Sequence, residues 1–242
     1  MKILFANGDS NTIGAELNPD NLYGDPNQSW PRWLSDKYNI PYHNVAVGGA
    51  GNEQINRSTV TAISSMVEIV NIDPKDIFVV ILWTSFNRYE YWSYDQRAHR
   101  SNSINSTYNP MGNVRKYVEY RTLIESDHYM IYKNLYHVYN TAKFLESYGI
   151  KYMFANGLKS FITPQEFDQS TEQNELKMEY RNLYTIYGDR KDNHLGFHNK
   201  DEMFKNYLTN IGCNLSTLGF KTHFDVNGQK KYADYLFEKI KC

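Results

Sequence analysis

The residues from Ile77 to Trp83 form an uninterrupted run of apolar β-formers. An alternating pattern would indicate a strand with one face in water, whereas a continuous run indicates a strand that is buried on both faces. Strands of this kind occur in parallel sheets that carry helices on both sides. The run therefore predicts that this chain of 242 residues folds around a parallel sheet.

Strand and helix patterns alternate along the rest of the chain. The expected strands are residues 2–6, 43–47, 77–83 and 151–155, and the expected helices are residues 52–70, 129–148 and 226–240, with one more opening at Ser29. A fifth strand is expected between residues 157 and 222, at a position that the pattern does not fix. This alternation predicts an α/β fold with a doubly wound parallel sheet and helices on both faces.

Two stretches interrupt the alternation. Residues 88–126 are polar and rich in tyrosine, and residues 157–199 are long and charged. Long irregular segments inside a compact domain are often lids or binding loops. We expect both to be insertions in a single domain that spans residues 1–242, because the length suits one domain and the composition shows no break.

Composition argues against several classes of protein. The net charge of −1 provides no basic field for nucleic acid, and no apolar run is long enough for a membrane span. The apolar start of the chain meets Asn7 too soon for a signal peptide, so synthesis in the cytoplasm is expected, with the final location open. Cys213 and Cys242 lack metal-ligand spacing. Neither a metal nor a cofactor is expected.

A Gly-Asp-Ser motif follows the first expected strand, with Ser10 as its serine. A serine at this point lies at the carboxyl edge of the sheet, where open α/β folds bind their ligands. Its backbone N–H also lies at a helix N-terminus, which suits an oxyanion. The alternative is that Asp9 or Ser10 caps the next helix.

Three further motifs follow later elements. Gly49 lies in a glycine-rich turn, Asn87 follows the buried run, and His223 precedes the last helix. Glycine lets a backbone approach a ligand closely, an asparagine amide can donate to an oxyanion, and a loop histidine can act as a general base. A dinucleotide loop is disfavoured because Gln54 replaces the third glycine of that fingerprint. The alternatives are a turn asparagine and a loop histidine beside a capping Asp225.

The order of these motifs resembles the conserved blocks of the SGNH (GDSL-type) hydrolases. Serine follows strand one, glycine follows strand two, asparagine follows strand three, and histidine precedes the last helix. The resemblance implies a three-layer, flavodoxin-like fold and hydrolysis of esters or thioesters without a cofactor. It also implies that Ser10 is the nucleophile and His223 the base. The Ser10 N–H, the Gly49 N–H and the Asn87 side chain would form the oxyanion hole.

The sequence departs from the family pattern beside the histidine. The family has an aspartate three residues before the histidine, and this chain has Phe220 there. The third member of the triad is therefore missing from its expected place. Either a Ser–His dyad works with a backbone carbonyl, or an acid comes from elsewhere in the chain.

Four other residues are candidates for substrate contacts: Asp9, Arg88, Tyr89 and Trp92. Arg88 suits an anionic group or an ion pair, and the aromatic pair suits a sugar. The predicted function is hydrolysis of carboxylic esters, including acyl groups on carbohydrate, by an incomplete triad or dyad. The alternative is a non-catalytic glycan-binding, protein-binding or structural protein on the same scaffold.

Overall fold

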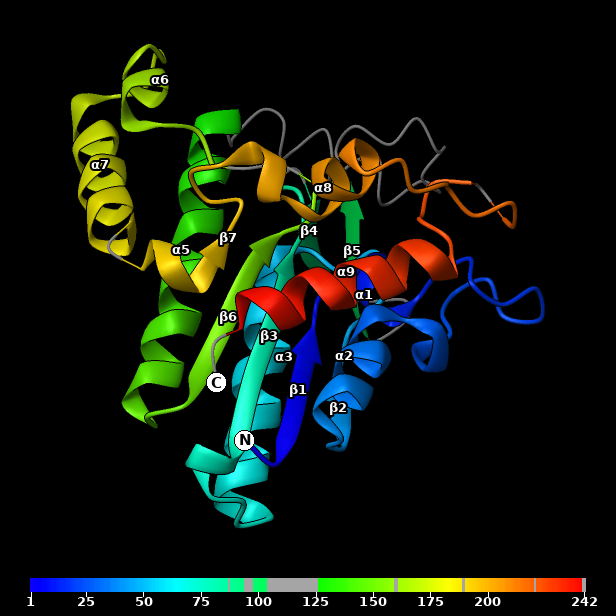
Figure 1. Cartoon of the computed structure of the whole chain (residues 1–242). Helices are drawn as coiled ribbons and strands as arrows, with labels where there is room; N and C mark the ends of the chain where they lie inside the picture. Colours follow the sequence, from blue (N-terminus) through cyan, green and yellow to red (C-terminus); the bar gives the residue numbers. More distant parts are fainter. Residues whose placement is uncertain are drawn as a thin grey trace.

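The computed structural model describes residues 1–86, 88–93, 98–103, 126–158, 161–188, 190–219 and 221–240. A five-stranded parallel sheet lies at its centre, with the strand order β2-β1-β3-β6-β7 (Figure 1). Its strands are β1 (Ile3–Asn7), β2 (Tyr42–Asn44), β3 (Ile77–Trp83), β6 (Lys151–Asn156) and β7 (His194–Leu195). This order is the flavodoxin-like arrangement, and it confirms the predicted fold class.

Helices cover both faces of the sheet (Figure 1). On one side lie α2 (Trp30–Tyr38) and α9 (Val226–Lys239), and on the other lie α3 (Asn52–Ser64) and α5 (Asp127–Ser147). Every residue of β3 is buried, with Val79 and Ile81 in the core below α3 and α5, and Phe78 and Val80 in the opposite core. Successive side chains of a strand point to opposite faces, so a strand between two apolar cores needs an unbroken apolar run.

Shorter elements complete the described structure. They are helices α1 (Ser10–Ile13), α6 (Pro164–Asp168), α7 (Asn174–Gly188) and α8 (Phe204–Asn210), 3-10 turns at Pro26–Gln28, Pro74–Asp76, Lys191–Asn193 and Lys200–Glu202, a π-helical turn at Ser65–Ile69, and an antiparallel hairpin of β4 (Arg88–Ser93) and β5 (Ala98–Ser103). Across the described ranges, each helix is too short or too polar to cross a lipid bilayer.

The expectation of irregular structure in residues 157–199 is wrong. Helix α7 occupies much of this stretch, because Tyr180, Leu183 and Tyr187 recur at helical spacing and join the core on the α5 side. The segment also contains β7, the fifth strand of the sheet. This strand has two residues, which is too short to leave a recognisable apolar run. In the other stretch, the hairpin β4–β5 replaces the expected loop at its start, and residues 104–125 lie outside the described residues.

The sheet order places the first motif at a switch point of the fold. Strands β1 and β3 are neighbours, and the sheet extends from β1 to β2 on one side and from β3 to β6 on the other. Asn7 at the end of β1 pairs in register with Ile81 of β3, so the two carboxyl ends lie side by side. Ligands of open α/β sheets bind at this kind of crevice. Ser10 begins α1 immediately beyond it.

Candidate active site

A sharp turn between β1 and α1 presents Ser10. The side chain of Asp9 caps α1 by accepting a hydrogen bond from the Asn11 N–H at 2.9 Å. Gly8 fits because a Cβ at that position would lie 2.9 Å from the carbonyl oxygen of Leu82. Ser10 is 8% exposed and is the first residue of the helix. The N–H groups of Thr12 and Ile13 also donate to Asp9, through its carbonyl oxygen, so the helix donor that this turn leaves for a ligand is the N–H of Ser10.

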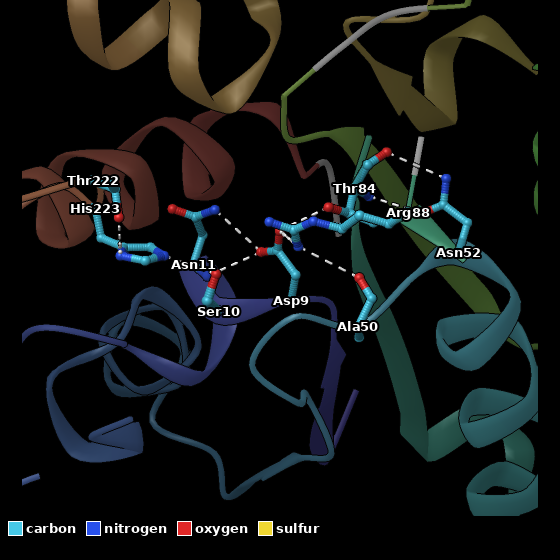
Figure 2. A network of polar contacts seen from close by, with 9 residues as sticks. All are labelled: Asp9, Ser10, Asn11, Ala50, Asn52, Thr84, Arg88, Thr222 and His223. Carbon is cyan, nitrogen blue, oxygen red and sulfur yellow. Dashed lines mark hydrogen bonds and ion pairs between the residues drawn. The ribbon is translucent and has the colours of Figure 1, made fainter. Parts of the chain in front are cut away.

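His223 approaches this hydroxyl from the other end of the chain. Its Nε2 lies 2.8 Å from the Ser10 Oγ, although 213 residues separate them (Figure 2). Two backbone hydrogen bonds fix the histidine loop, from Ser216 N–H to the His223 carbonyl at 2.7 Å and from Asp225 N–H to the Asn214 carbonyl at 3.1 Å. The expected cap is also present, because Asp225 accepts from the Gly228 N–H.

A carboxylate that the sequence did not indicate lies on the far side of the imidazole. Oε2 of Glu16 is 3.3 Å from Nδ1 of His223, and it accepts a hydrogen bond from the Thr222 N–H at 3.0 Å. The hydroxyl of Thr222 also lies 3.1 Å from Nδ1. Phe220, at the family position for the acid, lies outside the described residues.

The sequence signal for Glu16 was weak. It is an acidic residue between Ala15 and Leu17, which are both buried at 6% exposure. A charged residue in a small apolar stretch often points to solvent, and nothing local predicts that this one turns inward. The structure places it 2% exposed beside a histidine that follows it by 207 residues.

Asp9 lies at the centre of a second polar network beside Ser10 (Figure 2). Its Oδ2 accepts from Arg88 Nη1 at 2.7 Å and from the Thr84 hydroxyl at 2.8 Å. Asp9 is 1% exposed, and both of its carboxylate oxygens have partners within the chain, which argues against a direct contact with substrate. The Arg88 side chain is 19% exposed, and of the two alternatives for this residue it forms the ion pair.

Two further contacts bring the neighbouring loops to the same edge. Asn52, at the start of α3, exchanges hydrogen bonds with the backbone of Thr84, at 2.9 Å to its N–H and 3.2 Å to its carbonyl. The N–H of Val47 donates to the Gly8 carbonyl at 3.3 Å, which places the glycine-rich turn beside the serine turn. Gly49 in that turn has a φ of +80°, a conformation that favours glycine.

Three of the predicted site residues remain without a structural account. Asn87 lies outside the described residues. Tyr89 and Trp92 belong to β4, but their side chains are not among those described. Within the described part of the chain, no three His, Cys, Asp or Glu side chains gather in a way that could hold a metal ion.

Comparison with known proteins gives matches among solved structures alone. The sequence matches no family model and no curated protein. The structure is similar to that of a G-D-S-L family lipolytic protein from Desulfitobacterium hafniense DCB-2, with 15% identity, 99% of this chain and 100% of that chain covered, and a TM-score of 0.50. Two others are the esterase EstA from Pseudoalteromonas sp. (10% identity, 99% and 96% covered, TM-score 0.49) and the acetyl xylan esterase AlAXEase (14% identity, 100% of both chains covered, TM-score 0.47).

The first of these matches has the highest TM-score of the three. At its level of identity, the likeness establishes the fold and not the chemistry. This chain therefore has the three-layer, flavodoxin-like architecture of the SGNH hydrolases, which confirms the fold that the four sequence blocks predict.

Proposed function

We propose that this protein is a serine hydrolase that cleaves carboxylic esters, with Ser10 as nucleophile and His223 as general base. The observation that carries the proposal is the distance of 2.8 Å between His223 Nε2 and Ser10 Oγ. A general base must lie within hydrogen-bond reach of the proton that it removes, and this pair meets that condition. The pair also lies at the switch point of the sheet, where the fold binds ligands.

The reaction proceeds in two halves. In the first, Oγ of Ser10 attacks the ester carbonyl carbon while Nε2 of His223 takes the hydroxyl proton. The histidine then gives that proton to the departing alkoxide, which leaves as an alcohol, and the acyl group stays bonded to Ser10 Oγ. In the second half, water attacks the acyl carbon, His223 takes a proton from the water, and the proton returns to Ser10 as the carboxylic acid leaves.

The developing oxyanion needs donors that are in place before the reaction. We assign this role to the N–H groups of Ser10 and Gly49 and to the Asn87 amide, as the resemblance implies. The position of Ser10 in the first turn of α1 and the hydrogen bond of the glycine-rich turn to Gly8 support the two backbone donors. Loss of one such donor lowers turnover by about 100- to 1000-fold in comparable sites.

The ester itself is defined at the level of its class. Cleavage of acyl groups from carbohydrate stays a prediction, because this substrate class depends on the aromatic segment around Tyr89 and Trp92. A non-catalytic binding protein on the same scaffold is the alternative. It predicts an unreactive Ser10, so one experiment distinguishes the two.

The test is labelling with a fluorophosphonate, read by intact mass. An activated serine oxygen forms a bond to phosphorus while the phosphorus–fluorine bond breaks, and the protein gains the mass of the phosphonyl group. The wild-type protein should gain one adduct, and the Ser10→Ala variant should gain none. Ser85→Ala is the matched control, because Ser85 is also a buried serine at the carboxyl end of a central strand. This variant should label like the wild type.

Hydrolysis of short p-nitrophenyl esters by the same proteins gives a second readout. Activity in the wild type and in Ser85→Ala, with none in Ser10→Ala, supports the hydrolase. A folded wild-type protein that neither labels nor hydrolyses these esters would overturn the proposal and favour the binding protein.

A further inference from the structure

We infer that Glu16 is the carboxylate that orients the catalytic histidine and stabilises its positive charge. The site is then a Ser–His–Glu triad whose acid comes from the segment after the nucleophile. The inference rests on the proposed function of Ser10 and His223. It departs from the family pattern, in which the acid lies three residues before the histidine. Here the nucleophile is the first residue of the short helix α1, the acid follows shortly after the end of that helix, and the base comes from the opposite end of the chain.

The surroundings of Glu16 stabilise an ionised carboxylate that faces the imidazole. Its side chain is 2% exposed, so a charge here must be paired or hydrogen-bonded. Oε2 accepts from the Thr222 N–H at 3.0 Å and from the His223 N–H at 3.3 Å, and Oε1 accepts from the Thr222 hydroxyl at 3.3 Å. These donors favour the charged form and hold it 3.3 Å from Nδ1.

The backbone at Glu16 is held in an uncommon conformation. Its φ of 62° is in the left-handed region, which is unfavourable for a residue with a side chain. The Ser216 hydroxyl donates to the Glu16 carbonyl at 2.6 Å and helps to hold it there. Gly219 packs against the side chain, and a Cβ at Gly219 would lie 3.0 Å from Cγ of Glu16. The loop that carries His223 is therefore shaped around this carboxylate.

The position of the charge decides what the imidazole can do. A carboxylate beside Nδ1 favours the tautomer with the proton on Nδ1, which leaves Nε2 free to accept the Ser10 proton. It also stabilises the imidazolium that forms in the transition state. The Thr222 hydroxyl lies 3.1 Å from the same nitrogen and could orient the ring, but it carries no charge. The two contributions can therefore be separated by their dependence on pH.

The experiment measures the rate of fluorophosphonate labelling against pH for the wild type and four variants. Glu16→Gln removes the charge and keeps the size, and Glu16→Asp keeps the charge and shortens the side chain. Thr222→Val removes the hydroxyl beside Nδ1. Ser216→Ala is the matched structural control, because it loses a buried hydrogen bond to the Glu16 backbone and leaves the carboxylate in place. Far-UV circular dichroism and thermal unfolding establish that each variant is folded.

Glu16→Gln should label about 10,000-fold more slowly, as when a neutral amide replaces a triad acid. Its pH profile should also differ from that of the wild type, because the variant lacks the charged group beside Nδ1. Glu16→Asp should label faster than Glu16→Gln and keep the pH profile of the wild type, because it retains the charge. Thr222→Val and Ser216→Ala should lose less than about tenfold with an unchanged pH profile, because neither removes a charge.

Two results would overturn the inference while the proposed function survives. One is a wild type that labels on Ser10 together with a Glu16→Gln variant that labels within fivefold of it at an unchanged pH profile. The other applies if Glu16→Gln does not fold. In that case a folded Thr222→Val variant that fails to label, like Ser10→Ala, assigns the orientation of the imidazole to the Thr222 hydroxyl. A wild type that does not label contradicts the proposed function itself and is thus distinguished from both.

Discussion

Two histidines of this protein each have a hydrogen-bonding partner on both ring nitrogens, yet their surroundings differ. His223 lies at the carboxyl edge of the sheet with its side chain 16% exposed, between the Ser10 hydroxyl and the Glu16 carboxylate. His194 lies on β7 and is 2% exposed. Its Nδ1 is 2.6 Å from the Tyr187 hydroxyl, and its Nε2 is 3.0 Å from Oδ1 of Asn156.

The difference separates a histidine that lies between a hydroxyl and a carboxylate from one that is buried between uncharged partners. Burial lowers the pKa of His194 to about 3, so this ring stays neutral at physiological pH. Its partners are a phenol and an amide, and neither stabilises an imidazolium as a carboxylate does. His223 has the Ser10 hydroxyl on one side and the Glu16 carboxylate on the other. A short hydrogen bond to a histidine therefore points to proton transfer when a carboxylate also contacts the imidazole ring, and to packing when both partners are uncharged.

The largest expected effect is on reactivity at His223. His223→Gln should reduce fluorophosphonate labelling of Ser10 by about 10,000-fold or more, because it removes the proposed general base. Its thermal unfolding should stay close to that of the wild type, since the histidine lies at the surface of the site. A labelling rate within tenfold of the wild type would remove the distinction between the two histidines.

The next effect is on stability at His194. His194→Ala should lower the free energy of unfolding by about 3 kcal/mol, because it leaves a cavity and deprives Tyr187 and Asn156 of their partner. Urea denaturation measures this loss. His198→Ala is the matched control, since His198 is exposed, and it should cost less than about 0.5 kcal/mol. The folded fraction of His194→Ala should still label on Ser10 at nearly the wild-type rate, and a large loss of labelling would join His194 to the site.

The smallest effect is a dependence of stability on pH. In the native state the pKa of His194 is lowered to about 3, whereas the unfolded chain binds this proton near pH 6.5. Protons therefore favour the unfolded state, and the contribution is complete above pH 6.5 and declines as the pH falls toward 3. The wild type should lose up to about 1.4 kcal/mol per pH unit more than His194→Ala in that window. Urea denaturation at pH 7, 6 and 5 checks this, and equal slopes would contradict the burial of His194 as a neutral ring.

Much of the scaffold could be predicted from local pattern. The run from Ile77 to Trp83 gave the central strand, and helical spacing gave the helices that end the chain and follow Asn52. β7 could not be located, because two residues that pair with the end of β6 carry no periodic signal of their own. Helix α7 was missed because its exposed face is charged, which concealed the apolar stripe through Tyr180 and Leu183.

The candidate site also contains residues that the sequence indicated and residues that it did not. Ser10 and His223 could be named as candidates because their motifs stand in the block order of the SGNH hydrolases, with Ser10 after the first strand and His223 before the last helix. The partners of Asp9 could not be named, since Arg88 and Thr84 approach it across the sheet edge. Glu16 had no recognisable motif at all.

Local apolar patterns are enough to show which segments are buried and which side chains stand at the ends of strands, because burial leaves a period of two or 3.6 in the chain. The tertiary structure decided which of those side chains meet. The contact between Glu16 and His223 spans 207 residues and depends on a left-handed backbone and a loop folded around a buried carboxylate. No local pattern encodes such a contact, because its energy comes from desolvation and hydrogen bonding that exist once the segments are assembled.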